Sequence, residues 1–460
     1  SKNGYNAPTF ANGVTVSTAA TAGIGTFTTS TVVGSAVTSN ADGIVAAGII
    51  TAGTCFKTGD GVFGAGIGAT ITGAGDAVFA GVCTASSFDG DGSGLTGVAS
   101  TDNINTSTPA SFVDINATGI VTSSTFYPSV GWLGNRNVII NGGLIVAQRS
   151  TSTSSSPGYQ TVDRFSLSST ALDTLDYTQS QHDDYPDGFS KCYQIDVTTA
   201  ESTAVAGELF YVRYKVEAQD LRPFYNKDGT GKDFTLSFWV KAYQTGNYQV
   251  SIHKEDNTTR FISKTYTIDA ADTWQKIEWN VTGDTGTSGI NADNGQGFDI
   301  SWKLAAGTDF TSGTPQTTWG SFSNSYFAAG QAVNLADSTS NYWRITGVQL
   351  ELGSKATPFE HRSYADELIR CERYYEEGMV SAQGYVNASQ HVGIDASYRT
   401  QKRADSSTLT WTQSGTQGNI TGTTPDGVHR NNIWGAYAYQ TATAGGNWYY
   451  YYEIAADCEL

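Results

Sequence analysis

Residues Gly347 to Glu376 read GVQLELGSKATPFEHRSYADELIRCERYYE, and the periodicity changes along this stretch. In its first third, apolar residues alternate with Gln and Glu, which predicts a half-buried strand. The apolar face of that strand consists of Val348, Leu350 and Leu352. The alternation slips by one residue at Gly347, which predicts a β-bulge there.

A short helix is predicted over residues 361–377. Ser363 stands three residues before Asp366, the spacing of a capping-box start. Apolar side chains then recur at helical spacing and form one stripe, which consists of Tyr364, Leu368, Cys371 and Tyr375.

The whole stretch resembles a segment of phage tail-fibre and related virion appendage proteins, those of marine cyanophages especially. The family pattern is TGVQLELG, then TPFE, then EL..C.RYY. The matching positions here are Thr346 to Gly353, Thr357 to Glu360, and Glu367, Leu368, Cys371, Arg373, Tyr374 and Tyr375. The resemblance implies a homotrimer that is fixed at its N-terminus to a tail, baseplate or neck protein and that meets a host surface polysaccharide.

A second match begins at Trp132 with WLGNRNVIINGGLIVAQRS and continues to Phe165. It resembles the opening of a β-sandwich module of the same fibre proteins, with Ala147 standing where Trp is usual. The motif residues are Asn141 to Gly143, Gln148, Arg149, Tyr159, Asp163 and Arg164. Alternating strands follow, with apolar faces that include Phe210 to Val216, Phe234 to Val240, Ile277 to Val281 and Phe298 to Leu304. Residues 132–360 are therefore predicted to form a jelly-roll sandwich similar to carbohydrate-binding modules.

Composition sets limits on function. The chain has 460 residues, 52 Gly, only 15% charged residues and a net charge of −17. Such a negative surface repels phosphate backbones, so we expect no nucleic-acid partner. No apolar run of membrane length and no signal peptide are evident, so we expect no membrane insertion, synthesis in the host cytoplasm and a place in the virion. We expect free, buried thiols at Cys55, Cys83, Cys192, Cys371 and Cys458.

The N-terminal part is nearly uncharged. Residues 1–20 are expected to be a virion-attachment segment, and residues 21–131 a Gly/Ser/Thr-rich β shaft. A Gly-apolar-apolar core recurs in the shaft around Ile24, Ile44, Val62, Val78 and Ile120. The segment SFDGDGSGLTGV, residues 87–98, resembles a repeat of phage fibre shafts. An interwoven trimer is the first interpretation, and a single-chain β-solenoid is the alternative.

Residues 378–460 are predicted to form a β-rich C-terminal tip domain with many aromatic residues. Exposed rings can stack on sugars, although alternating aromatic residues also pack in cores or between chains. The predicted carbohydrate-binding residues are Trp434, Tyr437, Tyr439 and Trp448, with Asn431, Asn432 and Asn447 near them. The helix stripe, Tyr364, Leu368, Cys371 and Tyr375, is predicted to form a trimer-interface bundle beneath this domain.

Motifs for other functions are weak. GSGLTG, residues 92–97, matches GxGxxG but lacks the helix that a dinucleotide site needs, so a turn is expected. Calcium-binding turns are an alternative to ordinary turns at Asp89 and Asp91, at His182, Asp183, Asp184 and Asp187, and at Asn291, Asp293 and Asn294. GxSxG and HExxH are absent, and we expect no enzyme activity, no cofactor and no metal.

The sequence thus predicts an all-β trimeric fibre with a β shaft, a jelly-roll sandwich, one short α-helix and a β-rich tip. The first hypothesis for its function is an adhesin that binds host cell-surface glycans during adsorption. The alternative is an architectural collar or whisker fibre that contacts other virion proteins. A fibre-borne glycan hydrolase, which needs only two suitably spaced carboxylates, is the third hypothesis.

Overall fold

The fold is described from a computed structural model of the 460-residue chain. The structure describes residues 134–460, except 202–204, 257–258, 287–288, 406–407, 416 and 421–422, together with seven short strands nearer the N-terminus. The chain divides into two compact units, Ser1–Ile120 and Val121–Leu460, and each is described by itself.

The first unit contains short antiparallel strand pairs. One meander joins β1 (Thr31–Val33), β2 (Val37–Asn40) and β3 (Gly43–Ala46). Two hairpins follow, formed by β4 (Phe56–Thr58) with β5 (Gly61–Phe63), and by β6 (Ala69–Ile71) with β7 (Ala77–Phe79). Ile44, Val62 and Val78 of the predicted repeat lie on these strands, whereas Ile24 and Ile120 lie outside the described residues. The choice between an interwoven shaft and a solenoid stays a prediction.

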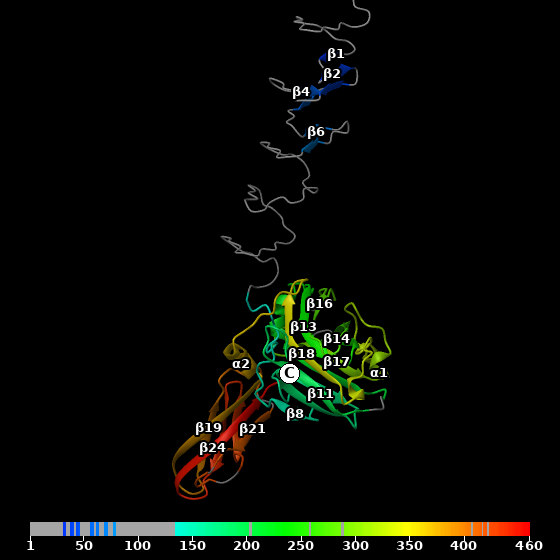
Figure 1. Ribbon diagram of the computed structural model, residues 1–460. Helices are drawn as coiled ribbons and strands as arrows, with labels where there is room; N and C mark the ends of the chain where they lie inside the picture. The colour runs from blue at the N-terminus through cyan, green and yellow to red at the C-terminus, as the bar shows by residue number, and fades with distance from the viewer. Residues whose placement is uncertain are drawn as a thin grey trace, which may run out of the picture. The chain divides into compact units, whose positions relative to one another are not determined.

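The second unit is dominated by a sandwich of two antiparallel sheets (Figure 1). The six-stranded sheet has the order β16 (Gln275–Val281), β13 (Phe234–Ala242), β18 (Tyr342–Leu352), β11 (Cys192–Thr199), β10 (Asp176–His182) and β8 (Ser152–Ser154). The five-stranded sheet has the order β15 (Arg260–Ile268), β14 (Gly246–Lys254), β17 (Gln296–Ala306), β12 (Leu209–Glu217) and β9 (Phe165–Thr170). The chain changes sheet at most steps, which is the connectivity of a jelly roll.

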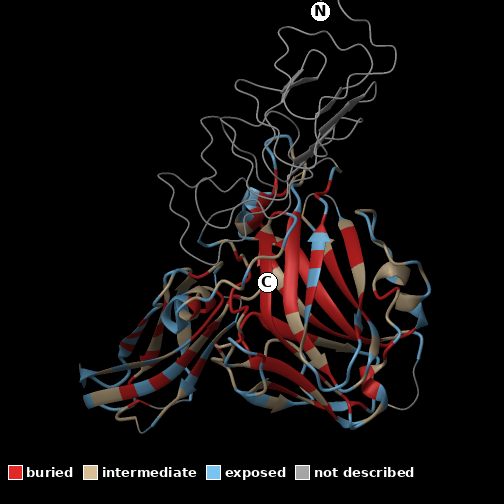
Figure 2. Ribbon diagram, turned by 45° about the horizontal axis from the view of Figure 1, so that its top comes forward, coloured by how far each residue is buried: buried red, intermediate tan, exposed pale blue. Residues whose placement is uncertain are grey.

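The core of the sandwich lies between the two sheets, where Figure 2 shows buried residues along most strands. Alternation along each strand directs the apolar side chains inward. Trp302 and Trp343 are fully buried there. The Trp302 ring centre is 5.7 Å from that of Phe238 in an edge-on arrangement, which is a favourable aromatic contact. The all-β sandwich predicted from the alternating strands is therefore confirmed.

The predicted bulge at Gly347 is also confirmed. The β13–β18 register shifts between Ser237 and Trp239, and Gly347 has φ of 61°. A Cβ at this position would lie 2.6 Å from the ring of Phe189, so the position needs glycine for both backbone and space. The bulge explains why the alternation in the sequence slips at this residue.

Short helical segments lie between strands. These are the 3₁₀ segments η2 (Ala218–Phe224), η3 (Asn324–Tyr326) and η4 (Leu335–Asp337), the single turn α1 (Thr308–Thr311), and α2 (Tyr364–Glu372). The Ser363 hydroxyl accepts a hydrogen bond from the Asp366 main-chain nitrogen at 3.1 Å, as the capping pattern predicted. The predicted short helix is therefore α2.

The C-terminal part consists of two three-stranded sheets that face each other. One has the order β19 (Tyr375–Val386), β24 (Gly446–Asp457) and β21 (Thr408–Gln413). The other has the order β20 (His391–Ser397), β23 (Gly435–Thr441) and β22 (Gly427–Asn432). Their small core includes Ile394, Ala438 and Tyr452, which are fully buried. We call this pair of sheets the tip.

The tip is joined to the sandwich by buried ion pairs. Arg164 is 1% exposed, pairs with Glu459, and lies 3.4 Å from the ring centre of Tyr374. Glu217 accepts hydrogen bonds from Arg373 Nη2 and from the Tyr374 hydroxyl, both at 2.7 Å. These contacts place the start of β19 and the residues after β24 against the sandwich.

Three of the five cysteines lie in the described residues, and Cys192, Cys371 and Cys458 are free and buried as expected. Cys55 and Cys83 lie outside those residues. No helix among the described residues is long and apolar enough to cross a membrane.

Candidate functional site

The strongest candidate site is the outer face of the tip sheet β20–β23–β22. Val392, Ile394 and Ala396 of β20 point into the core, so the alternate residues of that strand face outward. On β23, Ala436 and Ala438 are buried and Tyr437 and Tyr439 lie on the outer face, half-buried. The outward set from the three strands includes His391, Asp395, His429, Arg430, Tyr437 and Tyr439, and we call it the ring face.

Four rings of the ring face form a row. The Tyr439 ring centre is 4.3 Å from that of His391, with 19° between the ring planes. His429 lies on the other side, 4.8 Å from Tyr439 and 6.0 Å from Tyr437. Because each ring contacts its neighbour, the row holds the rings in place before any ligand binds.

Glycines on the neighbouring strands make room for the rings. Gly393 and Gly427 both pair in register with Tyr439, one from each side. A Cβ at Gly427 would lie 2.5 Å from Tyr439 Cε1, and a Cβ at Gly393 would lie 2.7 Å from the Tyr437 hydroxyl oxygen. Both tyrosine side chains therefore lean across the sheet over a glycine.

Charged groups flank the row. Asp395 on β20 and Arg430 on β22 pair in register with Tyr437 from opposite sides, and both are exposed. The ring face therefore combines apolar ring surface with a carboxylate, a guanidinium, two imidazoles and two phenols.

The structure separates the residues that the sequence predicted as one carbohydrate site. Tyr437 and Tyr439 lie together on the ring face, and Trp434 lies in the β22–β23 turn with 63% of its surface exposed. Trp448 lies on the inner face of the other sheet, where it stacks on Tyr450 at 5.7 Å. The structure therefore places Trp448 apart from the two tyrosines, with the tip core between them.

The three predicted asparagines do not gather on the ring face. The Asn432 side-chain oxygen Oδ1 accepts a hydrogen bond from the Trp434 main-chain nitrogen at 2.9 Å and shapes the turn. The Asn431 side chain contacts the Tyr398 hydroxyl at 3.1 Å. Asn447 lies on β24 in the other sheet, paired with Tyr385.

The residues that sequence reasoning missed are His391, Asp395, His429 and Arg430. One signal was available, because His391, Gly393 and Asp395 alternate with three apolar residues. Their approach to Tyr437 and Tyr439 depends on strand pairing and bulge position, which the local pattern does not give. The register shift between Val428 and Arg430 brings His429 into the row.

The predicted trimer-interface stripe is partly covered by its own chain. Cys371 is buried in a cluster with Ile140 and Val146, and Leu368 packs against that cluster. Tyr375 is buried beneath the Arg149 guanidinium, 3.6 Å from its ring centre. Tyr364 alone of the four is more than half exposed, at 56%. The trimer itself stays a prediction.

The candidate calcium turns use their carboxylates internally. Asp183 pairs with Lys191, and Asp184 pairs with Lys241 and Arg344. Asp293 accepts a hydrogen bond from the Gly295 main-chain nitrogen, which is an ordinary turn contact. Within the described ranges, no three His, Cys, Asp or Glu side chains gather as ligands for a metal ion. Asp89, Asp91 and the GSGLTG motif lie outside those ranges.

Comparison with solved structures finds β-sandwich proteins over nearly half of the chain. A tailspike protein 4 domain of bacteriophage CBA120 is 14% identical, with a TM-score of 0.26, and the match covers 47% of this chain and 22% of that one. A putative sugar binding protein from Bacteroides thetaiotaomicron is 13% identical, with a TM-score of 0.26 and coverage of 47% and 100%. A xylan-binding domain from Paenibacillus barcinonensis is 9% identical, with a TM-score of 0.23 and coverage of 45% and 94%.

No protein-family model matches the chain, and no curated protein matches it.

Proposed function

We propose that this chain is a phage virion appendage protein, an adhesin that holds host cell-surface glycans on the ring face of its tip. The observation that carries the proposal is the row of stacked rings with Asp395 and Arg430 in register on either side of Tyr437. The sequence resemblance to phage tail-fibre proteins supports the virion role.

The chemistry of the ring face suits sugars. The C–H groups of a pyranose pack on aromatic rings, while its hydroxyls need hydrogen-bond partners when water is displaced. The Asp395 carboxylate accepts from hydroxyls, the Arg430 guanidinium donates to them, and the phenols and imidazoles do both. An open sheet face binds a chain of sugars along its surface and does not enclose a single ring.

We propose binding without hydrolysis. A glycosidase needs two carboxyl groups on either side of the scissile bond, about 5 to 10 Å apart. The ring face offers Asp395 as its acid, with Arg430 and not a second carboxyl on the far side of Tyr437. Weak contacts of this kind become effective when a homotrimer and several fibres present them together.

The experiment is binding of the purified full chain to intact host cells and to their extracted polysaccharide. Tyr437→Ala and Tyr439→Ala are each expected to weaken binding at least about fivefold, because stacking on one ring contributes about 1 to 3 kcal/mol. Tyr385→Ala is the control, since Tyr385 is 75% exposed on the outer face of the other tip sheet.

If Tyr437→Ala and Tyr439→Ala bound as tightly as Tyr385→Ala, the assignment of the glycan site to the ring face would be contradicted. Absence of binding to cells and polysaccharide, together with binding to a recombinant virion protein, would favour the architectural collar or whisker fibre instead. Release of reducing sugar from the polysaccharide would favour the hydrolase.

A further inference from the structure

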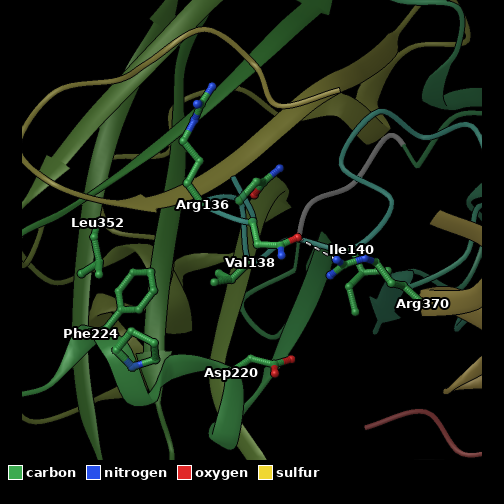
Figure 3. A pocket seen from close by; sticks show the side chains of 10 residues that line it. Arg136, Val138, Ile140, Asp220, Phe224, Leu352 and Arg370 are labelled. Atoms are coloured by element: carbon green, nitrogen blue, oxygen red, sulfur yellow. Dashed lines mark hydrogen bonds between the residues drawn. The ribbon is translucent and has the colours of Figure 1, made fainter. Parts of the chain in front are cut away.

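A pocket of about 290 Å³ lies on the sandwich, where residues 135–140, η2, the end of β18 and α2 meet (Figure 3). One side of it is apolar. Val138 and Leu352 pack against the sandwich core, Phe224 belongs to that core, and Ile140 is buried beside them. These side chains give the pocket a floor of aliphatic groups and one aromatic ring.

Two groups of opposite charge occupy the other walls of the pocket. Arg370 on α2 donates one N–H to the Asn135 side-chain oxygen at 2.8 Å, which fixes the guanidinium beside the opening. Asp220 on η2 lines the pocket too. Within the part of the chain that the structure describes, no hydrogen bond or ion pair engages the Asp220 carboxylate, whereas Arg370 keeps further N–H groups for a ligand.

Arg373 lies near Asp220 but pairs with Glu217. Arg373 donates through Nε and Nη2 to Glu217 at 3.1 and 2.7 Å, so its guanidinium is committed to that carboxylate. Burial, then the charge of Glu217, raises the pKa of Asp220 above its usual range. The fold therefore holds an unpartnered carboxylate in a partly buried position at an energetic cost, a common feature of functional sites.

We propose that this pocket binds one pyranose unit of a neutral sugar through two adjacent hydroxyls, one donating to Asp220 and one accepting from Arg370. A hydroxyl both donates and accepts, so a vicinal diol satisfies an acid and a guanidinium together. The C–H face of the ring packs on Phe224 and Val138, and the volume suits a single sugar. Amines meet two arginines here, Arg136 and Arg370, and anions meet Asp220.

The pocket does not depend on the ring face. Its walls come from the sandwich and α2, whereas the ring face belongs to β20, β22 and β23. Either site can fail while the other binds, so variants of each separate them.

The test is saturation-transfer NMR on the full chain with methyl glycosides of glucose, galactose, mannose and N-acetylglucosamine. We expect at least one to bind with a millimolar Kd. Asp220→Ala and Arg370→Met are each expected to weaken that binding at least tenfold. Asp228→Asn is the control, because Asp228 is exposed and bonds only to Thr230 in its own turn.

Asp220→Ala must also keep or raise the thermal midpoint, because it removes an unpartnered carboxylate and not a structural contact. Binding that survives in both pocket variants, or that is lost only in Tyr439→Ala, would overturn the proposal in favour of the ring face. Absence of saturation transfer from the unaltered chain to any of the four glycosides would overturn it outright.

Discussion

Arg164 and Glu459 form a buried ion pair across 295 positions of the sequence. The Arg164 guanidinium also donates to the Lys215 main-chain oxygen at 2.7 Å and lies against the ring of Tyr374. Arg164 is the last residue of the motif set that begins at Asn141, Tyr374 is the first tyrosine of RYY, and Glu459 follows the last strand of the tip. Sequence motifs that marked the family resemblance therefore meet at one junction between sandwich and tip.

Glu459→Ala is expected to destabilise this junction by about 3 kcal/mol or more, because it leaves the buried Arg164 charge without its partner. Burial of Arg164 is complete, so water cannot replace the carboxylate. Denaturant unfolding followed by the near-ultraviolet signal of the tip aromatics would measure the loss.

Glu453→Ala is the matched control for Glu459→Ala. Glu453 lies on β24 with its side chain exposed and bonded to the Ser414 hydroxyl. Its loss is expected to cost less than about 1 kcal/mol. Equal effects of the two substitutions would show that the buried pair does not hold the tip.

Asp163, next to Arg164, gives the junction a pH dependence. Burial raises the pKa of Asp163 from 3.8 to about 6, against the lowering effect of its hydrogen bonds from Gln148. The folded chain therefore binds this proton more tightly than the unfolded chain, and the free energy of unfolding rises as the pH falls through that window. The contribution between pH 7 and pH 5 is about 1 kcal/mol.

Comparison of the unaltered chain with Asp163→Asn isolates the contribution of Asp163 to the pH dependence of stability, because every other titrating group is common to both proteins. Unfolding free energies at pH 7 and pH 5 are expected to differ less in the variant. The same pH dependence in both proteins would assign the effect to other carboxyls. One of these is the partly buried Asp220, whose pKa is also raised.

Local sequence patterns predicted the elements of the fold well. Alternation predicted the strands β12, β13, β16, β17 and β18, the slip at Gly347 predicted a bulge, and Ser363 predicted a helix start. Each of these features depends on the preferences of a few neighbouring residues. They can therefore be read without knowledge of tertiary contacts.

The candidate site could be predicted only in part, because its geometry depends on pairing between distant strands. In residues 448–452 both alternating sets are aromatic, so the pattern does not say which set faces inward. The structure turns Trp448 and Tyr450 into the core and leaves Tyr451 exposed. Of the predicted helix stripe, Tyr364, Leu368 and Cys371 lie on α2, whereas Tyr375 begins β19. Residues of the same chain cover Cys371, and the trimer interface stays a prediction.

Lys303 is expected to be a site where removing a charge stabilises the fold. It is fully buried on β17, its Nζ lies 2.8 Å from the Ser251 hydroxyl, and the ring centre of Phe327 is 3.8 Å away. Burial lowers the pKa of Lys303 well below its usual range, so placing the charged amine in this position opposes folding.

Lys303→Met is therefore expected to raise the free energy of unfolding at pH 7 by about 1 to 4 kcal/mol, the range seen when buried ionic groups are replaced by apolar ones. The Ser251 and Ser301 hydroxyls stay partnered, because they are 3.0 Å apart. The stability advantage of Lys303→Met should shrink as the pH rises toward the pKa of an ordinary lysine. A variant less stable than the unaltered chain at pH 7 would contradict this interpretation.

Gly427→Ala tests whether glycan binding depends on the positions of the rings on the ring face and not only on their presence. The new Cβ would lie 2.5 Å from Tyr439 Cε1, so the ring must move away from β22 while the strand pairing remains. Gly378→Ala is the control, since its Cβ would meet its nearest neighbour at an ordinary 3.7 Å. Glycan binding is expected to weaken several-fold in Gly427→Ala alone, with shifted His391 and His429 imidazole resonances in the same variant. Unchanged binding alongside shifted resonances would mean that the glycan does not contact the row, because the rings would have moved without consequence for the ligand.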